Sequence, residues 1–136
     1  MKILGISHLG LAVRSVDEAT KFFSGALGLP AGGQERVEDQ RVQLSWHPVG
    51  KSRIELLEPT DPSSVVARFL EKRGEGIHHV CFIVEDIKGA LKELQAKGIR
   101  LIDEIPRKGA GGCQIAFLHP ESTHGVLIEL SEESKI

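Results

Sequence analysis

Runs of apolar residues with the character of buried strands recur in the same order in the two halves of the chain. Each half opens on one such run, continues with a second that ends in a His-Pro dipeptide, and closes on an Ile-Glu-Leu triplet. Short, β-rich apolar runs of this kind are typical of strands in a covered sheet. The paired segments are Ile6–Val13 with Ile77–Val84, Val42–Pro48 with Gln114–Pro120, and Arg53–Leu56 with Leu127–Leu130. This pattern predicts an internal duplication.

A helix is predicted after the first strand of each copy. Ser15 and Glu18 form a capping box at the start of the first helix, and Asp86 is the expected N-cap of the second. Gly28 and Gly98 follow the helical patterns, at positions where a left-handed glycine commonly ends a helix. The apolar stripes expected to face the sheet are Ala19, Phe22, Phe23 and Leu27 in the first helix and Ile87, Ala90, Leu91 and Leu94 in the second.

Each copy therefore reads as a βαβββ module. The additional strand is placed near Gln34–Glu38 in the first copy and near Arg100–Glu104 in the second. A module of about 60 residues is marginally stable by itself, so we expect the two modules to pack into one domain. That domain covers 1–136, with modules at about 1–60 and 75–132 and a linking helix at about 62–74.

Four polar residues have the strand parity that points away from the predicted helices. Side chains alternate between the two faces of a strand. In each copy the large apolar residues of the first and last strands share one parity, while one His and one Glu have the other. These residues are His8, Glu55, His79 and Glu129. If the His strand and the Glu strand are neighbours, which the sequence leaves open, two imidazoles and two carboxylates converge, and this set suits Co, Mn, Ni, Fe or Zn.

A single His or Glu on a strand is most often only the polar side of a half-exposed strand. Both copies keep the same two residue types at the same parity, and this pairing favours a shared metal site. The other histidines have weaker claims: His78 has the helix-side parity, His47 and His119 suggest turns, and His124 lies in a polar loop. Cys81 has the site parity and is interpreted as a small apolar residue rather than a ligand.

Composition and charge argue against several classes of function. The 136 residues include 17 basic and 19 acidic side chains, a formal net charge of −2, which indicates no basic stripe for nucleic acid. No apolar run approaches the roughly 20 residues that cross a bilayer, and no signal peptide is visible. Cys81 and Cys113 lack a metal or redox spacing and fit a reducing compartment. We expect a cytoplasmic protein that binds neither nucleic acid nor membrane.

With a strand His and a closing-strand Glu in each copy, the chain resembles the vicinal oxygen chelate superfamily over nearly its whole length. This resemblance implies an α+β fold in which two βαβββ modules form a U-shaped, eight-stranded mixed sheet around a metal cleft. A narrower resemblance is to the methylmalonyl-CoA epimerase family. The segments that carry it are Ile54–Pro59, Gly76–Val80, Gly109–Gly112, Phe117–Pro120 and Gly125–Leu130.

The narrower resemblance implies an isomerase with a divalent metal ion. Its reaction interconverts the R and S forms of methylmalonyl-CoA at C2, through proton abstraction and a metal-stabilised enolate. Residue by residue, His8, Glu55, His79 and Glu129 match the metal ligands of the family. Glu129 is the expected proton carrier on one face of the substrate, and Glu55 on the other. Cobalt is the first expectation for the ion, with Mn, Ni, Zn or Fe as alternatives.

The resemblance also implies partners, and the chain departs from it at one position. The expected partners are a CoA thioester substrate and a second copy of the chain in a homodimer. Some members have a further acid–base Glu, which the alignment places at Gln43 or Leu44, so this carboxylate is missing here. The glycine-rich stretch Gly109–Gly112 is either a flexible hairpin or, with Arg107 or Lys108, a contact for the CoA phosphates.

Three alternative functions share the predicted fold. A glyoxalase I-type lactoylglutathione lyase has similar chemistry but needs a glutathione site, which the sequence does not reveal. A ring-cleaving dioxygenase usually holds iron with two His and one Glu, so the additional Glu55 argues against it. A non-enzymatic antibiotic-binding relative needs no metal ligands, and the presence of four argues against it.

Overall fold

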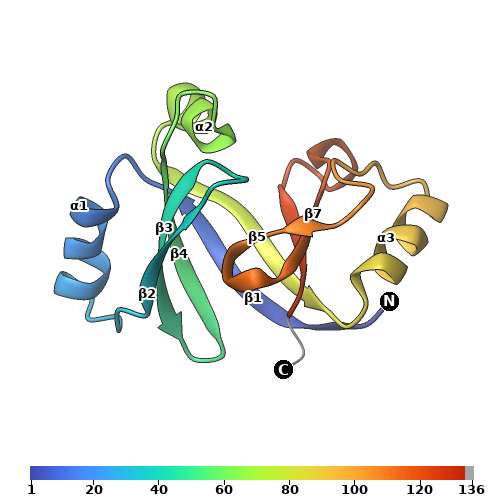
Figure 1. Ribbon diagram of the computed structural model, residues 1–136, viewed down its shortest axis with the longest axis horizontal. Helices are drawn as coiled ribbons and strands as arrows, with labels where there is room; N and C mark the ends of the chain where they lie inside the picture. Colours follow the sequence, from blue (N-terminus) through green and yellow to red (C-terminus); the bar gives the residue numbers. More distant parts are fainter. Residues whose placement is uncertain (134–136) are drawn as a thin grey trace. The chain divides into compact units, whose positions relative to one another are not determined.

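The structure is a computed structural model that describes residues 1–133. Within that range strands and helices are combined in an α+β arrangement (Figure 1). The strands are β1 (Ile3–Ala12), β2 (Gly33–Val37), β3 (Val42–Val49), β4 (Ser52–Pro59), β5 (Gly76–Val84), β6 (Arg107–Lys108), β7 (Gln114–Leu118) and β8 (Ile128–Glu132). The α-helices are α1 (Val16–Thr20), α2 (Val65–Arg73) and α3 (Ile87–Ala96). Further helical segments are the π-helix η1 (Lys21–Ala26) and the 3-10 turns η2 (Ala110–Gly112) and η3 (Pro120–Ser122).

The strands form one mixed sheet of eight strands in the order β2-β3-β4-β1-β5-β8-β7-β6. The first strand of each copy pairs in parallel with the last strand of the same copy, β1 with β4 and β5 with β8. The other pairs within each copy are antiparallel. The predicted fold class, α+β with two βαβββ modules in a mixed eight-stranded sheet, is confirmed. The His strand and the Glu strand of each copy are neighbours, as the metal-site hypothesis requires.

The chain divides into two compact units. One is His8–His78, and the other combines Met1–Ser7 with the chain from His79 onward. Residues Met1–Ser7 are grouped with the chain from His79 onward, and two hydrogen bonds connect them. The N-terminal ammonium donates to Glu93 Oε1 at 2.6 Å, and the Glu85 N–H donates to the Lys2 carbonyl at 3.1 Å. The hydrogen bond from this ammonium, with a further one from Lys97, holds the pKa of Glu93 below its ordinary value.

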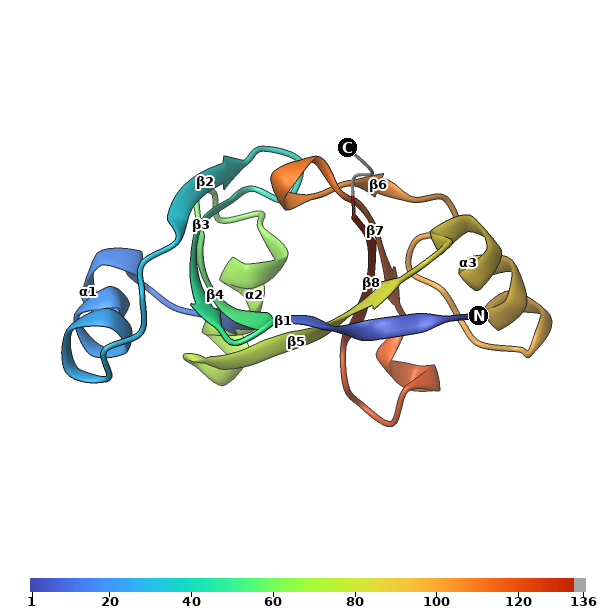
Figure 2. The same ribbon diagram turned by 90° about the horizontal axis from the view of Figure 1, so that it is seen from below.

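In the unit His8–His78, helix α1 packs against β3 and β4 (Figure 2). Ser15 is the N-cap of the helix, as predicted, because its Oγ accepts from the Glu18 N–H at 3.1 Å, while the Glu18 carboxylate accepts from Lys21 Nζ at 2.8 Å. The side chain of Glu58, on β4, accepts from the Val16 N–H at 2.7 Å and so satisfies another free donor of the first turn. The apolar cluster below the helix consists of Val13, Val16 and Leu56, with Leu11, Ala19, Phe23 and Ile54 packed around it.

The apolar stripe predicted for the first helix is wrong at Phe22 and Leu27, which are 56% and 57% exposed. The helix changes from α to π geometry after Thr20, and η1 continues it as far as Ala26. A π turn holds more residues than an α turn, so the residues after it leave the stripe that 3.6-residue spacing predicts. Phe23 keeps its place against the core, whereas Phe22 faces outward and meets Phe23 edge to face.

In the other unit, helix α3 lies against β7 and β8 (Figure 1). Asp86 is its N-cap, as predicted, and accepts from the Gly89 N–H at 3.1 Å. Glu132, on β8, accepts from the Ile87 N–H at 3.0 Å, which repeats the role of Glu58 in the first copy. The core beneath the helix consists of Val84, Ile87, Ala90, Leu91, Ala116, Leu118 and Leu130.

The prediction of a strand at Arg100–Glu104 is wrong. Only Leu101 forms a β-bridge there, with Leu118, and the edge strand β6 lies at Arg107–Lys108. In a regular sheet the Phe117 N–H would donate to a backbone carbonyl of the neighbouring strand. Here it donates to the carboxylate of Asp103 at 2.9 Å. This side-chain acceptor replaces a rung of backbone hydrogen bonding, and Pro106 offers no N–H to resume it before β6.

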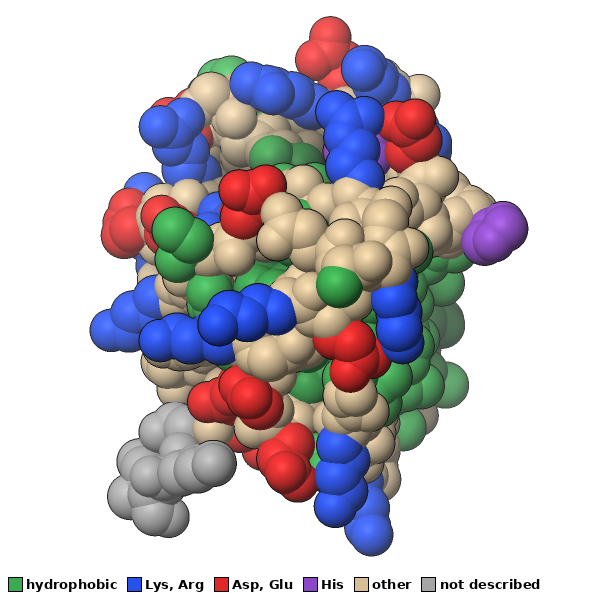
Figure 3. Space-filling model, turned by 90° about the vertical axis from the view of Figure 1, so that its right-hand side faces the viewer, with side chains coloured by type: hydrophobic (Ala, Val, Ile, Leu, Met, Phe, Trp, Pro, Cys, Tyr) green, Lys and Arg blue, Asp and Glu red, His purple; other side chains and the backbone are tan. Residues whose placement is uncertain are grey.

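Charged side chains of both signs are interspersed on the face of the molecule seen in Figure 3. This distribution agrees with the nearly balanced numbers of basic and acidic residues. Among residues 1–133, no helix has the length and apolar character needed to cross a bilayer.

Leu56 is fully buried between β4 and helix α1, and it offers a test of this packing. We expect Leu56→Ala to lower the free energy of unfolding by about 2–5 kcal/mol, because it removes buried contacts and leaves a cavity. Val65→Ala, at a 62% exposed position on α2, is the control and should change it by less than about 1 kcal/mol. Urea unfolding followed by circular dichroism measures both variants, and equal losses would contradict the packing described here.

Candidate metal centre

His8 and Glu55 form a buried pair within the unit His8–His78. In the parallel pairing of β1 with β4, His8 lies opposite Arg53, and Gly10 lies opposite Glu55. His8 and Glu55 are therefore diagonal neighbours on the same sheet face, where Gly10 adds no side chain between them. The distance from His8 Nε2 to Glu55 Oε1 is 3.2 Å, and both residues are almost fully buried.

His79 and Glu129 form the equivalent pair in the other unit. Cys81 lies opposite Glu129 in the pairing of β5 with β8, as Gly10 lies opposite Glu55. The distance from His79 Nε2 to Glu129 Oε1 is 3.0 Å, and these residues are also almost fully buried. The duplication therefore reproduces the His–Glu geometry in addition to the residue types.

The distances within both pairs fit ligands of one metal ion. Two donors that each lie about 2.1 Å from an ion, at about 90° to each other, are about 3.0 Å apart. The observed Nε2–Oε1 distances of 3.2 Å and 3.0 Å match that value. His8, His79 and Glu129, which offer two imidazoles and one carboxylate, are a candidate set of metal ligands. Imidazole and carboxylate donors suit a borderline divalent ion.

Arg53 distinguishes the first pair from the second. It lies two residues before Glu55, on the same face of β4, and its Nε and Nη2 both contact Glu55 Oε2 at 2.8 Å. The other carboxylate oxygen, Oε1, is the one that meets His8. The equivalent position before Glu129 is Leu127, which carries no charge. The two carboxylates of the candidate site therefore have different electrostatic surroundings.

An aromatic side chain lies beside each carboxylate in the strand register. Trp46 on β3 is opposite Glu55, and Phe117 on β7 is opposite Glu129. The Trp46 indole packs on the backbone of Gly32, where an added Cβ would lie 2.2 Å from the ring atom Cδ1. Phe117 meets the His79 ring edge to face, with the ring centroids 5.6 Å apart. The Phe117 ring therefore covers one edge of the His79 ring, and Trp46 is the cross-strand neighbour of Glu55.

The register distinguishes the faces of the two residues at which a further acid–base Glu was expected in some relatives. Leu44 pairs with Leu57, which shares the face of Glu55, and Leu44 is buried. Gln43 pairs with Glu58, whose side chain caps helix α1 on the opposite face. Of the two, Leu44 therefore has the face of the candidate site, and its side chain is apolar.

The histidines outside the two pairs have other contacts. His47 lies within β3 rather than at a turn, and its ring nitrogens meet Ser24 Oγ at 3.1 Å and Ser45 Oγ at 3.0 Å. His119 has the predicted turn role, because it caps η3 and its Nδ1 accepts from the Glu121 N–H. His78 meets the Phe69 ring of helix α2, as its parity predicts. His124 is exposed in a loop.

The sequence alone did not single out Arg53, Trp46 or Phe117. Arg53 shares the parity of Glu55, so its place on the site face was available from the strand pattern. The equivalence of Trp46 and Phe117 cannot be recognised from the sequence, because alignment of the two His-Pro dipeptides matches Trp46 with Leu118. The register instead pairs Trp46 with Glu55 and Phe117 with Glu129, one residue away from that match.

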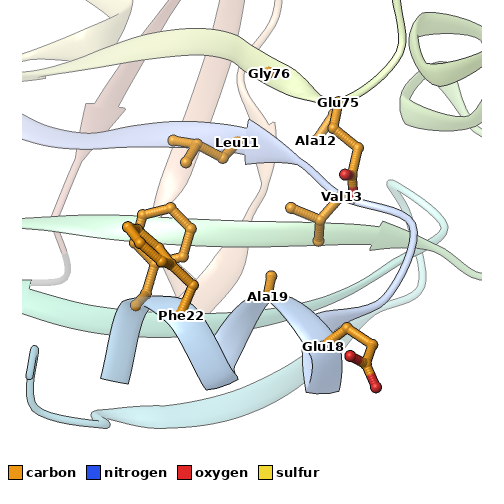
Figure 4. A pocket seen from close by; sticks show the side chains of 9 residues that line it. Leu11, Ala12, Val13, Glu18, Ala19, Phe22, Glu75 and Gly76 are labelled. Carbon is orange, nitrogen blue, oxygen red and sulfur yellow. The ribbon is translucent and has the colours of Figure 1, made fainter. Parts of the chain in front are cut away.

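A surface pocket of about 390 Å³ lies on the other side of β1, between this strand and helix α1 (Figure 4). Apolar side chains of Leu11, Val13, Ala19 and Phe22 line it, and carboxylates lie at its rim. One of these, Glu75, accepts from the Arg14 N–H at 2.9 Å. The pocket is on the helix side of the sheet and contains none of the candidate metal ligands.

Comparison with known proteins gives consistent results across sequence and structure. Residues 7–117 match the family model described as the glyoxalase/bleomycin resistance protein/dioxygenase superfamily. The chain is 42% identical to the uncharacterized protein YqjC of Bacillus subtilis (93% of this chain, 91% of the relative). It is 35% identical to the ethylmalonyl-CoA/methylmalonyl-CoA epimerase of Cereibacter sphaeroides (93% and 96%). A solved methylmalonyl-CoA epimerase in complex with methylmalonyl-CoA and NH4+ superimposes with a TM-score of 0.95, 33% identity and coverage of 99% and 98%.

Removal of one imidazole tests the metal centre directly. We expect His79→Ala to weaken Co2+ binding by about 100-fold or more, because it removes an imidazole nitrogen that would bind the ion. His124→Asn is the control, since that residue is exposed and has a left-handed φ of 58° that Asn tolerates. Isothermal titration of metal-free protein with CoCl2 measures both affinities. Unchanged binding by His79→Ala would remove this residue from the ligand set.

Proposed function

The chain belongs to the glyoxalase/bleomycin resistance protein/dioxygenase superfamily and, within it, to the methylmalonyl-CoA epimerase family, and we propose on this basis that it epimerises methylmalonyl-CoA with a bound divalent ion. Several of its relatives and solved neighbours are methylmalonyl-CoA epimerases, and the chain is an enzyme of the isomerase class. The observation that carries the proposal is the pair of buried His–Glu contacts at equivalent positions of the two copies.

The chemical problem in this reaction is an unstable negative charge. Epimerisation at C2 removes a proton from a carbon that lies between a thioester and a carboxylate, and it returns a proton to the opposite face. The charge that develops moves onto the thioester oxygen. A divalent ion held by His8, Glu55, His79 and Glu129 would supply Lewis-acid stabilisation of that charge.

The protein must also supply proton carriers. Glu129 is the proposed base for one face of C2, because it is a buried carboxylate next to His79 and therefore has a fixed orientation. Glu55 occupies the equivalent position in the other copy and is the proposed carrier for the opposite face. Leu44 supports this assignment, since it leaves no carboxylate at the position where some relatives are expected to have a further acid–base Glu.

The aromatic neighbours of the two carboxylates support proton transfer in a dry environment. Trp46 and Phe117 are the cross-strand partners of Glu55 and Glu129. Exclusion of water from the reacting carbon increases the effect of each nearby charge. The proposed site thus combines charge stabilisation, two positioned carboxylates and apolar walls.

Contact with the CoA carrier is proposed for the segment that contains β6 and η2. Arg107 lies over the Phe117 ring at 5.5 Å from its centroid, and Gly109–Gly112 forms a tight turn beside it. A guanidinium and the backbone N–H groups of a glycine-rich turn are suited to phosphate oxygens. Cobalt as the preferred ion, a cytoplasmic location and a homodimer remain predictions. Metal analysis of purified protein, cell fractionation and analytical ultracentrifugation test them in turn.

A Glu129→Gln variant tests the proposed reaction. NMR of methylmalonyl-CoA in D2O with Co2+-loaded wild-type protein is expected to show deuterium entering C2 together with racemisation. Glu129→Gln should slow that exchange by about 100-fold or more, because a positioned general base contributes a factor of about 10² to 10⁴. Glu121→Gln, which changes an exposed residue of η3, is the control.

Two outcomes would contradict the proposal. No exchange by wild-type protein with any of the five candidate metals would exclude the epimerase assignment. Formation of lactoylglutathione from methylglyoxal and glutathione by the same preparation would favour the glyoxalase alternative. Exchange at the wild-type rate by a metal-loaded Glu129→Gln variant would leave the epimerase assignment intact and remove Glu129 as the base.

A further inference from the structure

We propose that Arg53 is a positioning residue that reserves one oxygen of Glu55 and keeps the metal centre attractive to an anionic chelating ligand. The contact that carries the proposal is that of Arg53 Nε and Nη2 with Glu55 Oε2, both at 2.8 Å. This inference rests on the proposed metal centre. It concerns a residue that is itself neither a proposed metal ligand nor a proposed proton carrier.

The geometry divides the two oxygens of Glu55 between two partners. Oε2 is held by the guanidinium, and Oε1 meets His8 Nε2 at 3.2 Å. Charge-assisted contacts from two nitrogens fix the carboxylate more strictly than one neutral hydrogen bond. With Oε2 engaged, Glu55 offers a single oxygen to an ion beside His8. A carboxylate that offers both oxygens would occupy an additional coordination position.

The charge of Arg53 has a second consequence. A centre with two carboxylates cancels the charge of a divalent ion, and a neutral centre attracts a dicarboxylate substrate poorly. Arg53 adds one positive charge beside the His8–Glu55 pair. Its side chain is 31% exposed, whereas that of Glu55 is 4% exposed, so the guanidinium lies between the buried carboxylate and solvent. Leu127, at the equivalent position of the other copy, makes no such contribution.

The two effects predict different results for the metal and for an anionic ligand. Removal of a positive charge cannot weaken the electrostatic attraction of the centre for a cation. It does weaken the attraction of the loaded centre for an anion. A residue that only supported the fold would, when removed, loosen the ligands and weaken both. Separation of the two affinities is therefore the signature of the proposed role.

The experiment measures both affinities in full-length protein. Co2+ is titrated into metal-free protein, and malonate, a chelating dicarboxylate, is then titrated into the Co2+-loaded protein. For Arg53→Met we expect unchanged or tighter Co2+ binding and malonate binding about tenfold weaker or more, for loss of one charge near the ion. Arg36→Met, which removes an exposed arginine paired with Glu38 on the edge of the sheet, should leave both affinities within about twofold.

A conservative variant separates charge from shape. Arg53→Lys keeps one positive charge beside Glu55 and loses the planar guanidinium, so we expect it to bind malonate within about threefold of wild type, in contrast to Arg53→Met. If Arg53→Met fails to fold in a thermal melt, Arg53→Gln replaces it, because it also removes the charge and should weaken malonate binding by a similar factor.

The outcomes separate this proposal from the proposed function. Co2+ and malonate affinities that fall together, a malonate affinity unchanged in Arg53→Met, or an Arg53→Lys variant as weak as Arg53→Met would each overturn the role of Arg53. Wild-type protein that binds no Co2+ would overturn the metal centre and this role together. Wild-type protein that binds Co2+ and malonate without exchanging the C2 proton would overturn only the epimerase assignment.

Discussion

The parallel pairing of the first and last strands of each copy is the constraint on which the candidate site depends. It places the His of one strand diagonally beside the Glu of the other, in β1 with β4 and again in β5 with β8. A shift of one residue in either pairing would turn the Glu toward the helix and the apolar residues toward the site. The buried imidazole and carboxylate groups carry a large desolvation cost, so the fold keeps a polar cluster where an apolar core would be more stable. Such a cost is typical of a functional site.

The same strands also hold the helices in place. The Glu three residues after each site Glu, Glu58 in one copy and Glu132 in the other, has the opposite parity and bonds to the first turn of α1 or α3. One short motif, Glu-x-x-Glu, thus provides a candidate ligand on one face of the sheet and a helix cap on the other. The helix dipole favours a carboxylate at that end, and the bond satisfies a backbone donor that would otherwise lack a partner. This link explains why the duplicated segment keeps both acidic positions.

Much of this arrangement could be predicted from the sequence, because it follows from periodicity and local hydrogen bonding. The duplication, the helix caps at Ser15 and Asp86, and the parity of the His and Glu residues are all local signals. The errors arise where a local pattern has a non-local outcome. The π turn of η1 changes which residues face the core, and the Asp103 carboxylate replaces a strand rung at Phe117. The His-Pro dipeptides look equivalent in the sequence, yet His47 lies inside a strand and His119 begins a helical turn.

The two copies differ in the surroundings of their site carboxylates, although the repeated sequence pattern suggests that they are equivalent. A duplication gives two equal carboxylates, but the proposed reaction gives them different tasks, proton removal from one face and proton return to the other. Arg53 stands before Glu55 where Leu127 stands before Glu129, so one carboxylate has an ionic partner on its own strand and the other an apolar neighbour. Environments that distinguish two similar acids are a common way to assign them separate roles. The asymmetry between Arg53 and Leu127 is therefore the feature that converts a duplicated scaffold into a site with two distinguishable carboxylates.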